Sequence, residues 1–183
     1  DIALPSRRGV GHVFSSQHTS VEKAEQELAN YIKADPTLAD VQPSPRTIKF
    51  EPGHREKFWH KNCVAVGVSA GFVEPLEASA LILIEKSAEW ISEQLPEDSA
   101  AMPLVAKRFN EITSQHWRSI IDFLKLHYVL SERSDSEYWR DHSDEKSIPE
   151  SLQESMSLWR TQVPWLHETN YRVELFSSVS LQY

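Results

Sequence analysis

The pattern of apolar and polar residues changes along the 183-residue chain, and the change lies near residue 77. Before it, residues 62–68 form a short apolar run with alternating valines, whose length and β-branched content predict a buried strand. After it, apolar residues recur at helical spacing from Ala78 until Pro96 stops the pattern, which predicts a helix. Between the two elements stands Glu74-Pro75-Leu76-Glu77. The pattern therefore predicts a buried strand, a tight loop with two carboxylates, and a helix N-terminus directed at the same space.

The remaining predicted elements follow the same division. Strands are expected over about residues 10–16 and 47–50, and helices over about 19–35, 103–127 and 147–163, with a short helical turn at Tyr138-Trp139. Two of these helices open with a capping-box pattern, Thr19-x-x-Glu22 and Ser147-x-x-Glu150. All five glycines lie before residue 72, so tight turns belong to the first part and nearly continuous helix to the second. A last segment around residues 171–175 fits a strand or a helix.

Composition narrows the class of protein. The net charge of −8 argues against a general nucleic-acid binder, which would show a basic patch. The single cysteine, Cys63, excludes an internal disulfide framework, and its place in the apolar run predicts a small buried side chain. No stretch approaches the ~20 apolar residues of a membrane span, so no membrane is expected as a partner. The net charge likewise argues against a nucleic-acid partner. A cytoplasmic location is the default expectation.

Specific motifs stand on this framework. The run Trp59-x-x-Asn62-x-Val64-Ala65-x-Gly67, followed by Gly71-Phe72-Val73-Glu74-Pro75-Leu76-Glu77, resembles the signature of the flavin-dependent tryptophan halogenases. The similarity continues in shorter motifs: Phe109-Asn110, Asp122-Phe123, His127-Tyr128 and Ser136-x-Tyr138-Trp139-Arg140. It covers the chain from about residue 2 to residue 176.

The resemblance implies an α/β fold, a fragment of an FAD/NAD(P)-binding, monooxygenase-like flavoprotein. Residues 1–76 would belong to its flavin-binding core and residues 77–183 to a mainly helical substrate-side region. Such an enzyme takes FADH2 that diffuses from a separate flavin reductase, and uses O2 and chloride or bromide to halogenate a small tryptophan- or indole-like substrate. The family's Gly-x-Gly-x-x-Gly motif and its catalytic lysine do not occur in this chain, so we expect the fragment alone to be inactive. The resemblance is also compatible with a full-length enzyme that forms a homodimer.

The resemblance assigns roles residue by residue. Glu77 corresponds to the glutamate that directs substitution on the substrate ring, and is the expected catalytic residue. Ser79 and Ala80 correspond to the pair whose backbone N–H groups hold the halide, while Val68 and Leu81 correspond to flavin-contacting positions. The chain departs from the family at Ala78-Ser79-Ala80, where Ser-Thr-Gly is usual, so a Cβ stands at the halide position.

Two alternatives stay open at this stage. One is a non-halogenating FAD monooxygenase on the same scaffold. The other is a serine hydrolase, because Gly67-Val68-Ser69-Ala70-Gly71 matches the Gly-x-Ser-x-Gly elbow. Against the hydrolase, Pro75 would fall inside the helix that follows an elbow serine, at a cost of ~3 kcal/mol. No zinc-binding pattern occurs and no metal ligand is assigned; substrate identity, regioselectivity and the choice between chloride and bromide also stay open.

Overall fold

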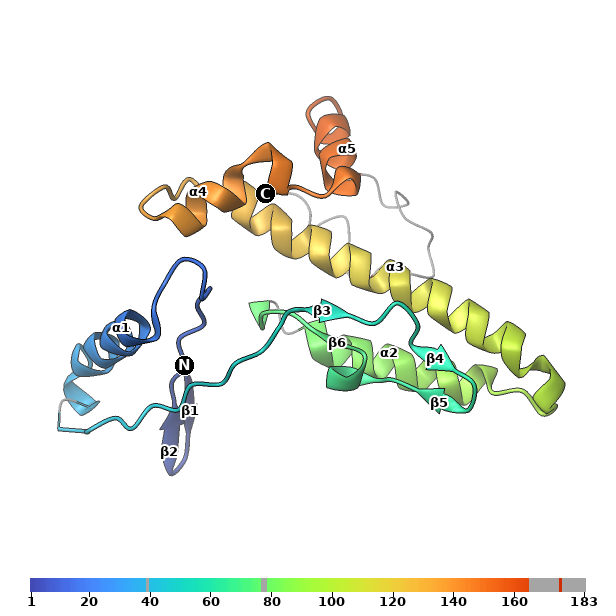
Figure 1. Ribbon diagram of the computed structural model, residues 1–183, viewed down its shortest axis with the longest axis horizontal. Coiled ribbons are helices and arrows are strands. Elements are labelled where there is room, and N and C mark those ends of the chain that lie inside the picture. The colour runs from blue at the N-terminus through green and yellow to red at the C-terminus, as the bar shows by residue number, and fades with distance from the viewer. Residues whose placement is uncertain (39, 77–78, 165–174, 176–183) are drawn as a thin grey trace. The chain divides into compact units, whose positions relative to one another are not determined.

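The computed structural model describes residues 1–38, 40–76, 79–164 and 175. The chain divides into two compact units, Asp1–Phe50 and Glu51–Tyr183, which Figure 1 shows as a ribbon. Every strand in the described residues lies before residue 73, and the long helices other than α1 follow residue 78. This order agrees with the predicted change from strands to helices near residue 77. None of the described helices is both long and apolar enough to cross a membrane.

The first unit pairs a small hairpin with one helix. Strand β1 (Ile2–Leu4) pairs antiparallel with β2 (Arg7–Gly9), and helix α1 (Val21–Lys33) and the 3-10 turn η1 (Pro36–Leu38) follow. The predicted helix is confirmed, but its cap is Ser20 and not Thr19, since the Ser20 side chain accepts a hydrogen bond from the Lys23 N–H at 3.2 Å. The strands predicted over 10–16 and 47–50 are wrong, because neither segment pairs with a neighbouring strand.

The second unit begins with two short antiparallel pairs. Strand β3 (Gly53–His54) pairs with β6 (Gly71–Phe72), and β4 (Trp59–His60) pairs with β5 (Cys63–Val64). The predicted buried strand over 62–68 is wrong. Only Cys63–Val64 (β5) pairs as a strand there, and after the extended Val66 the chain enters the 3-10 turn η2 (Gly67–Ser69), where Gly67 has a left-handed φ of 64°. Cys63 is exposed, contrary to expectation, because it lies next to the hairpin turn between β4 and β5.

The helices of the second unit match the predictions closely. They are α2 (Ser79–Gln94), α3 (Met102–Val129), α4 (Glu137–Ser143) and α5 (Glu150–Trp159), with 3-10 turns η4 (Ser99–Ala101) and η5 (Glu145–Ser147) between them. Pro103 lies in the first turn of α3, as predicted. The predicted cap of α5 is wrong, because its N-cap is Pro149 and no side chain caps it. Instead, Ser151 joins α5 to α3 by donating to Asp122 Oδ2 at 2.7 Å.

The core of this unit lies where α2, α3 and the short strands meet (Figure 1). Its buried members are Phe58, Trp59, Ala70, Leu83, Phe109, Trp117, Ile120 and Leu124. Trp59 meets Phe109 edge-on with ring centroids 5.6 Å apart, and Trp90 meets the same ring at 5.2 Å. The segment around Trp59 is therefore packed directly onto the helix pair that follows the Glu74–Glu77 loop.

Candidate functional site

The loop from β6 to α2 forms the centre of the candidate site. Its turn is closed by a hydrogen bond from the Leu76 N–H to the Glu74 carbonyl at 2.9 Å, around Pro75. Val73 and Leu76 pack against the buried core, so the loop is anchored on both sides of Glu74. Glu77, the predicted catalytic residue, and Ala78 lie outside the described residues. The structure therefore describes the approach to Glu77 up to Leu76.

The two predicted halide-binding residues open helix α2. Ser79 is the first residue of the helix and only 6% exposed, whereas Ala80 is exposed. The first N–H groups of any α-helix have no partner inside the helix, and the helix dipole adds a partial positive charge there. With 16 residues, α2 is long enough for a full dipole. The start of α2 thus has the chemistry of an anion site.

The two predicted flavin-contacting residues lie on elements that pack together. Val68 on η2 is 78% exposed and Leu81 on α2 is 72% exposed. The turn η2 lies against α2, and a Cβ added at Gly67 would stand 3.4 Å from the Ile84 side chain. Ile84 is itself 41% exposed. We refer to these three exposed aliphatic side chains on the packed elements η2 and α2 as the Val68–Leu81 surface.

Ser69 does not have the geometry of a hydrolase nucleophile. Its Oγ donates to the Val66 carbonyl at 2.8 Å and accepts from the Val66 N–H at 3.0 Å, so the hydroxyl closes its own turn. An elbow serine stands between a strand and a helix. Here Ser69 ends a 3-10 turn that leads into β6 instead. The hydrolase alternative is therefore not favoured.

The structure adds two polar interactions that the sequence did not predict. Asn110 on α3 is hydrogen-bonded to the backbone of Phe58 and Trp59. Tyr128, in the last turn of α3, lies near enough to Glu74 of the loop for the charge of that carboxylate to raise the pKa of its hydroxyl. The sequence offered a signal for both residues, since each belongs to a short motif shared with the halogenase family, but the motif alone does not name a partner.

Two ionisable side chains on α3 are shifted by their surroundings. His116 is buried, and burial together with the positive charge of Lys86 on α2 lowers its pKa. Burial, the hydrogen bond to Tyr138 and the charge of Glu74 raise the pKa of Tyr128, so its hydroxyl keeps its proton at neutral pH. Within the described ranges, no group of three or more His, Cys, Asp and Glu side chains is arranged to hold a metal ion.

Two tryptophan halogenases are similar to this chain in sequence. A tryptophan 7-halogenase of Kutzneria sp. (strain 744) is 36% identical over 166 residues, which is 89% of this chain and 30% of that protein. A tryptophan 6-halogenase of Streptomyces toxytricini is 32% identical over 163 residues, which is again 89% of this chain and 30% of that protein. The chain therefore spans about a third of the length of these relatives.

Solved structures agree with the sequence relatives. A tryptophan halogenase from Shewanella frigidimarina NCIMB 400 superposes with a TM-score of 0.87 and 48% identity, over 94% of this chain and 32% of that one. BrvH, a flavin-dependent halogenase from Brevundimonas sp. BAL3, superposes with a TM-score of 0.76 and 37% identity, over 92% and 32%. These likenesses confirm the predicted fold class, part of a flavin-dependent halogenase fold. Since the sequence profile of the tryptophan halogenases also matches residues 1–183, the chain belongs to the tryptophan halogenase family.

Proposed function

We propose that this chain is part of a flavin-dependent halogenase that halogenates a tryptophan- or indole-like substrate with reduced FAD, O2 and chloride or bromide. The family match over residues 1–183 carries the proposal. Relatives named as tryptophan 6- and 7-halogenases support this substrate class. Residues 1–76 contribute to the flavin-binding core and residues 77–183 to the substrate side. The full-length enzyme takes FADH2 from a separate flavin reductase in the cytoplasm.

The Val68–Leu81 surface supports a flavin contact. Val68 and Leu81 are 78% and 72% exposed, so both side chains are open to contact with a flat ring system. The neighbouring turn lies against the Ile84 side chain of α2, which an added Cβ at Gly67 would approach to 3.4 Å. Bound FAD, once reduced, would supply from O2 the oxidising equivalent that converts halide to an electrophilic halogen.

The start of α2 supports halide binding by Ser79 and Ala80. Backbone N–H groups at a helix N-terminus bind anions without any positively charged side chain. Ala80 replaces the glycine that is usual in the family, but a Cβ leaves its backbone N–H free to donate. Ser79 is only 6% exposed, so an anion held by its N–H would be partly withdrawn from bulk water, which would strengthen the interaction.

Glu77 has the chemistry that the last step needs. In electrophilic substitution the aromatic ring adds the halogen, becomes cationic, and then loses a proton from the same carbon. A carboxylate close to that carbon stabilises the cation and accepts the proton. In the sequence, Glu77 follows directly after the turn at Glu74–Leu76, which a backbone hydrogen bond closes.

Product analysis tests the proposal. The full-length protein is incubated with a flavin reductase, NADH, FAD, bromide and, in separate reactions, tryptophan and indole. Mass spectrometry is expected to show a product in which one hydrogen is replaced by bromine, and the product disappears when bromide is left out. A hydroxylated product instead, formed with or without halide, would establish the non-halogenating monooxygenase and overturn the proposal.

A further inference from the structure

Arg55, the residue after β3, binds the turn η2 from outside the turn. Its side-chain Nε donates to the Ser69 carbonyl at 2.5 Å, and its backbone N–H donates to the Ala70 carbonyl at 2.9 Å. Ser69 is the last residue of η2, and Ala70 is its C-cap. A guanidinium is always charged, so its bond to a carbonyl is stronger than one between neutral groups. One residue thus restrains two successive peptide groups at the end of the turn that carries Val68.

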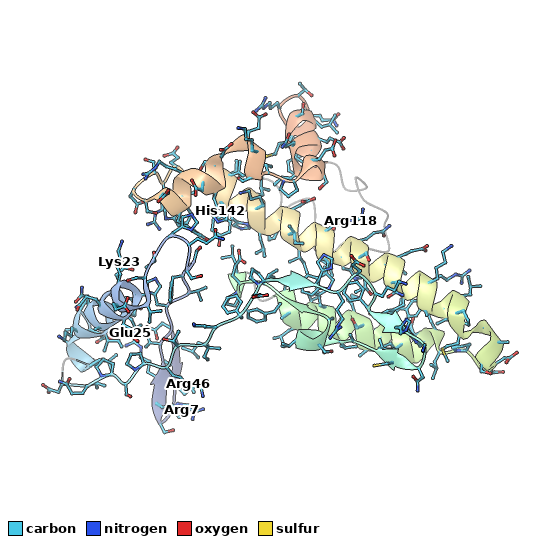
Figure 2. The ribbon with its side chains drawn as sticks, in the orientation of Figure 1. Arg7, Lys23, Glu25, Arg46, Arg118 and His142 are labelled. Atoms are coloured by element: carbon cyan, nitrogen blue, oxygen red, sulfur yellow. The ribbon has the colours of Figure 1, made fainter. Side chains whose placement is uncertain are left out.

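The strand pair behind Arg55 gives this restraint a fixed origin. Strand β3 pairs with β6, and the backbone bond of Arg55 extends the pairing by one further step. The ring of His54, the preceding residue, stacks on Trp117 with centroids 5.3 Å apart and on Phe58 with centroids 5.9 Å apart. Both of these partners are buried, and Figure 2 labels Arg118, the residue that follows Trp117 on α3. The Arg55 backbone is therefore tied to the core of the second unit.

The turn η2 has little packing of its own. None of its three residues is buried, and Val68 is 78% exposed. The Ser69 hydroxyl is bonded to the N–H and the carbonyl of Val66, which fixes the shape of the turn but not its place in the protein. Its place is set by β6, which continues from it, by α2, against which it lies, and by Arg55. Of these contacts, the bond from the Arg55 side chain can be removed by one substitution that leaves the backbone unchanged.

We infer that Arg55 is a positioning residue for Val68: by binding the Ser69 carbonyl, it keeps the exposed valine where the flavin ring would lie against it. The inference rests on the proposed function for this flavin consequence alone. A contact surface that is ordered before binding gives tighter binding, because less conformational freedom is lost when the ligand arrives. A turn released from Arg55 would have to be ordered by FAD itself. FAD would then bind more weakly, while the aromatic substrate would bind as before.

Hydrogen exchange in the full-length protein tests the restraint without any assay of activity. In Arg55→Ala we expect the peptide covering residues 65–71 to exchange about three to ten times faster, since a charged hydrogen bond at an exposed position is lost. Arg55→Lys keeps a charged donor within reach of the Ser69 carbonyl and should restore most of the protection. Lys57→Ala is the matched control, because it removes an exposed positive charge whose side chain makes no hydrogen bond with η2 in the described part of the chain. Its exchange in this peptide is expected to stay within about twofold of the parent.

FAD titration of the full-length protein connects the restraint to Val68. Arg55→Ala is expected to raise the Kd for FAD about threefold to tenfold, the cost of ordering a contact on binding. Val68→Ala should also weaken binding, and the combined variant should lose less than the sum of the two effects, because both act on one contact. In the halogenation assay, Arg55→Ala should raise the KM for FADH2 and leave the KM for tryptophan unchanged. A general loss of folded protein would not separate the two KM values.

The outcomes separate this inference from the proposed function. Exchange in Arg55→Ala that matches the parent, or FAD effects of Arg55→Ala and Val68→Ala that add fully, would overturn the positioning role. If Arg55→Ala does not fold, Arg55→Gln removes the charge with a smaller change in size and takes its place in the same comparisons. A parent protein that binds FAD but halogenates no substrate would overturn the proposed function, while the exchange and titration results would still decide the role of Arg55.

Discussion

Asn110 holds the backbone of Trp59 by both of its polar groups. Its Oδ1 accepts from the Trp59 N–H at 2.8 Å, and its Nδ2 donates to the Trp59 carbonyl at 2.9 Å. The same oxygen also accepts from the Phe58 N–H at 2.7 Å. Both aromatic residues are almost completely buried, so their backbone groups have no access to bulk water. One side chain on α3 therefore satisfies the backbone at the point where the β4–β5 hairpin enters the core.

Asn110→Ala is expected to destabilise the protein by about 2–4 kcal/mol, because it leaves two buried N–H groups and one carbonyl without a partner. Urea unfolding followed by tryptophan fluorescence measures the change. Asn110→Asp is the matched control, since a carboxylate still accepts from both N–H groups and loses only the donor. The explanation requires a smaller loss in Asn110→Asp than in Asn110→Ala, and equal losses would contradict it.

Gly71→Ala is expected to be destabilising because β6 passes very close to its neighbours. A Cβ at this position would lie 2.7 Å from the Gly53 carbonyl oxygen, from His54 Cβ and from the Trp117 ring. Backbone and a buried indole cannot move aside cheaply, so we expect a cost of about 1–3 kcal/mol. Gly11→Ala is the control, since nothing lies within 4 Å of its added Cβ. Equal melting temperatures for the two variants would show that β6 has more room than the structure indicates.

The sequence predicted the helices far better than the strands. Helices α2 and α3 carry apolar residues at helical spacing over many turns, and proline marks the start of α3 and follows the end of α2. The run 62–68 is too short to show a period, and its apolar residues are divided between β5 and the turn η2. Strand pairing stops at Val64, and the backbone leaves the extended conformation at Gly67 with a left-handed φ of 64°, a local feature that competes with β-propensity.

Prediction of the candidate site met a different limit. The site residues were named through the Glu74–Glu77 motif, whose members are adjacent in the sequence. The partner of the Trp59 backbone is Asn110, which comes from a helix far along the chain. Such a pair depends on how α3 packs against the segment at Phe58 and Trp59. Hydrophobic periodicity and short motifs therefore cannot predict it.

His116 is expected to make stability fall on mild acidification. Burial and Lys86 lower its pKa, so below the ordinary value of about 6.5 the unfolded chain binds a proton that the folded state does not. The folded state is therefore favoured fully above that pH and loses this contribution as the pH falls toward 5. His116→Leu should show a smaller drop in melting temperature between pH 7 and pH 5 than the parent. The exposed His60 provides the control, and His60→Leu should keep the parental drop; parallel curves for all three proteins would exclude His116 as a source.

Bromide is expected to bind at the start of α2 in the full-length enzyme. Crystals soaked in bromide should give an anomalous peak beside the backbone N–H groups of Ser79 and Ala80. Ala80→Gly, which restores the residue usual in the family, should keep the peak and lower the KM for halide, because it removes a Cβ beside the anion. A well-occupied peak only at another place would remove the halide assignment from these two residues.

Glu77→Gln separates a catalytic carboxylate from one that merely caps a helix. Glutamine keeps the size and the hydrogen-bonding capacity of the side chain but can neither stabilise a cationic ring with a full charge nor accept its proton. General-base help of this kind contributes ~10²–10⁴ in rate, whereas a carboxylate at a helix N-terminus contributes only ~0.3–1 kcal/mol of stability. In the full-length enzyme we therefore expect a nearly parental melting temperature and flavin content, with halogenation slower by at least about tenfold. The assignment of Glu77 fails if the variant halogenates at the parental rate, or if it loses activity only in proportion to the protein that unfolds.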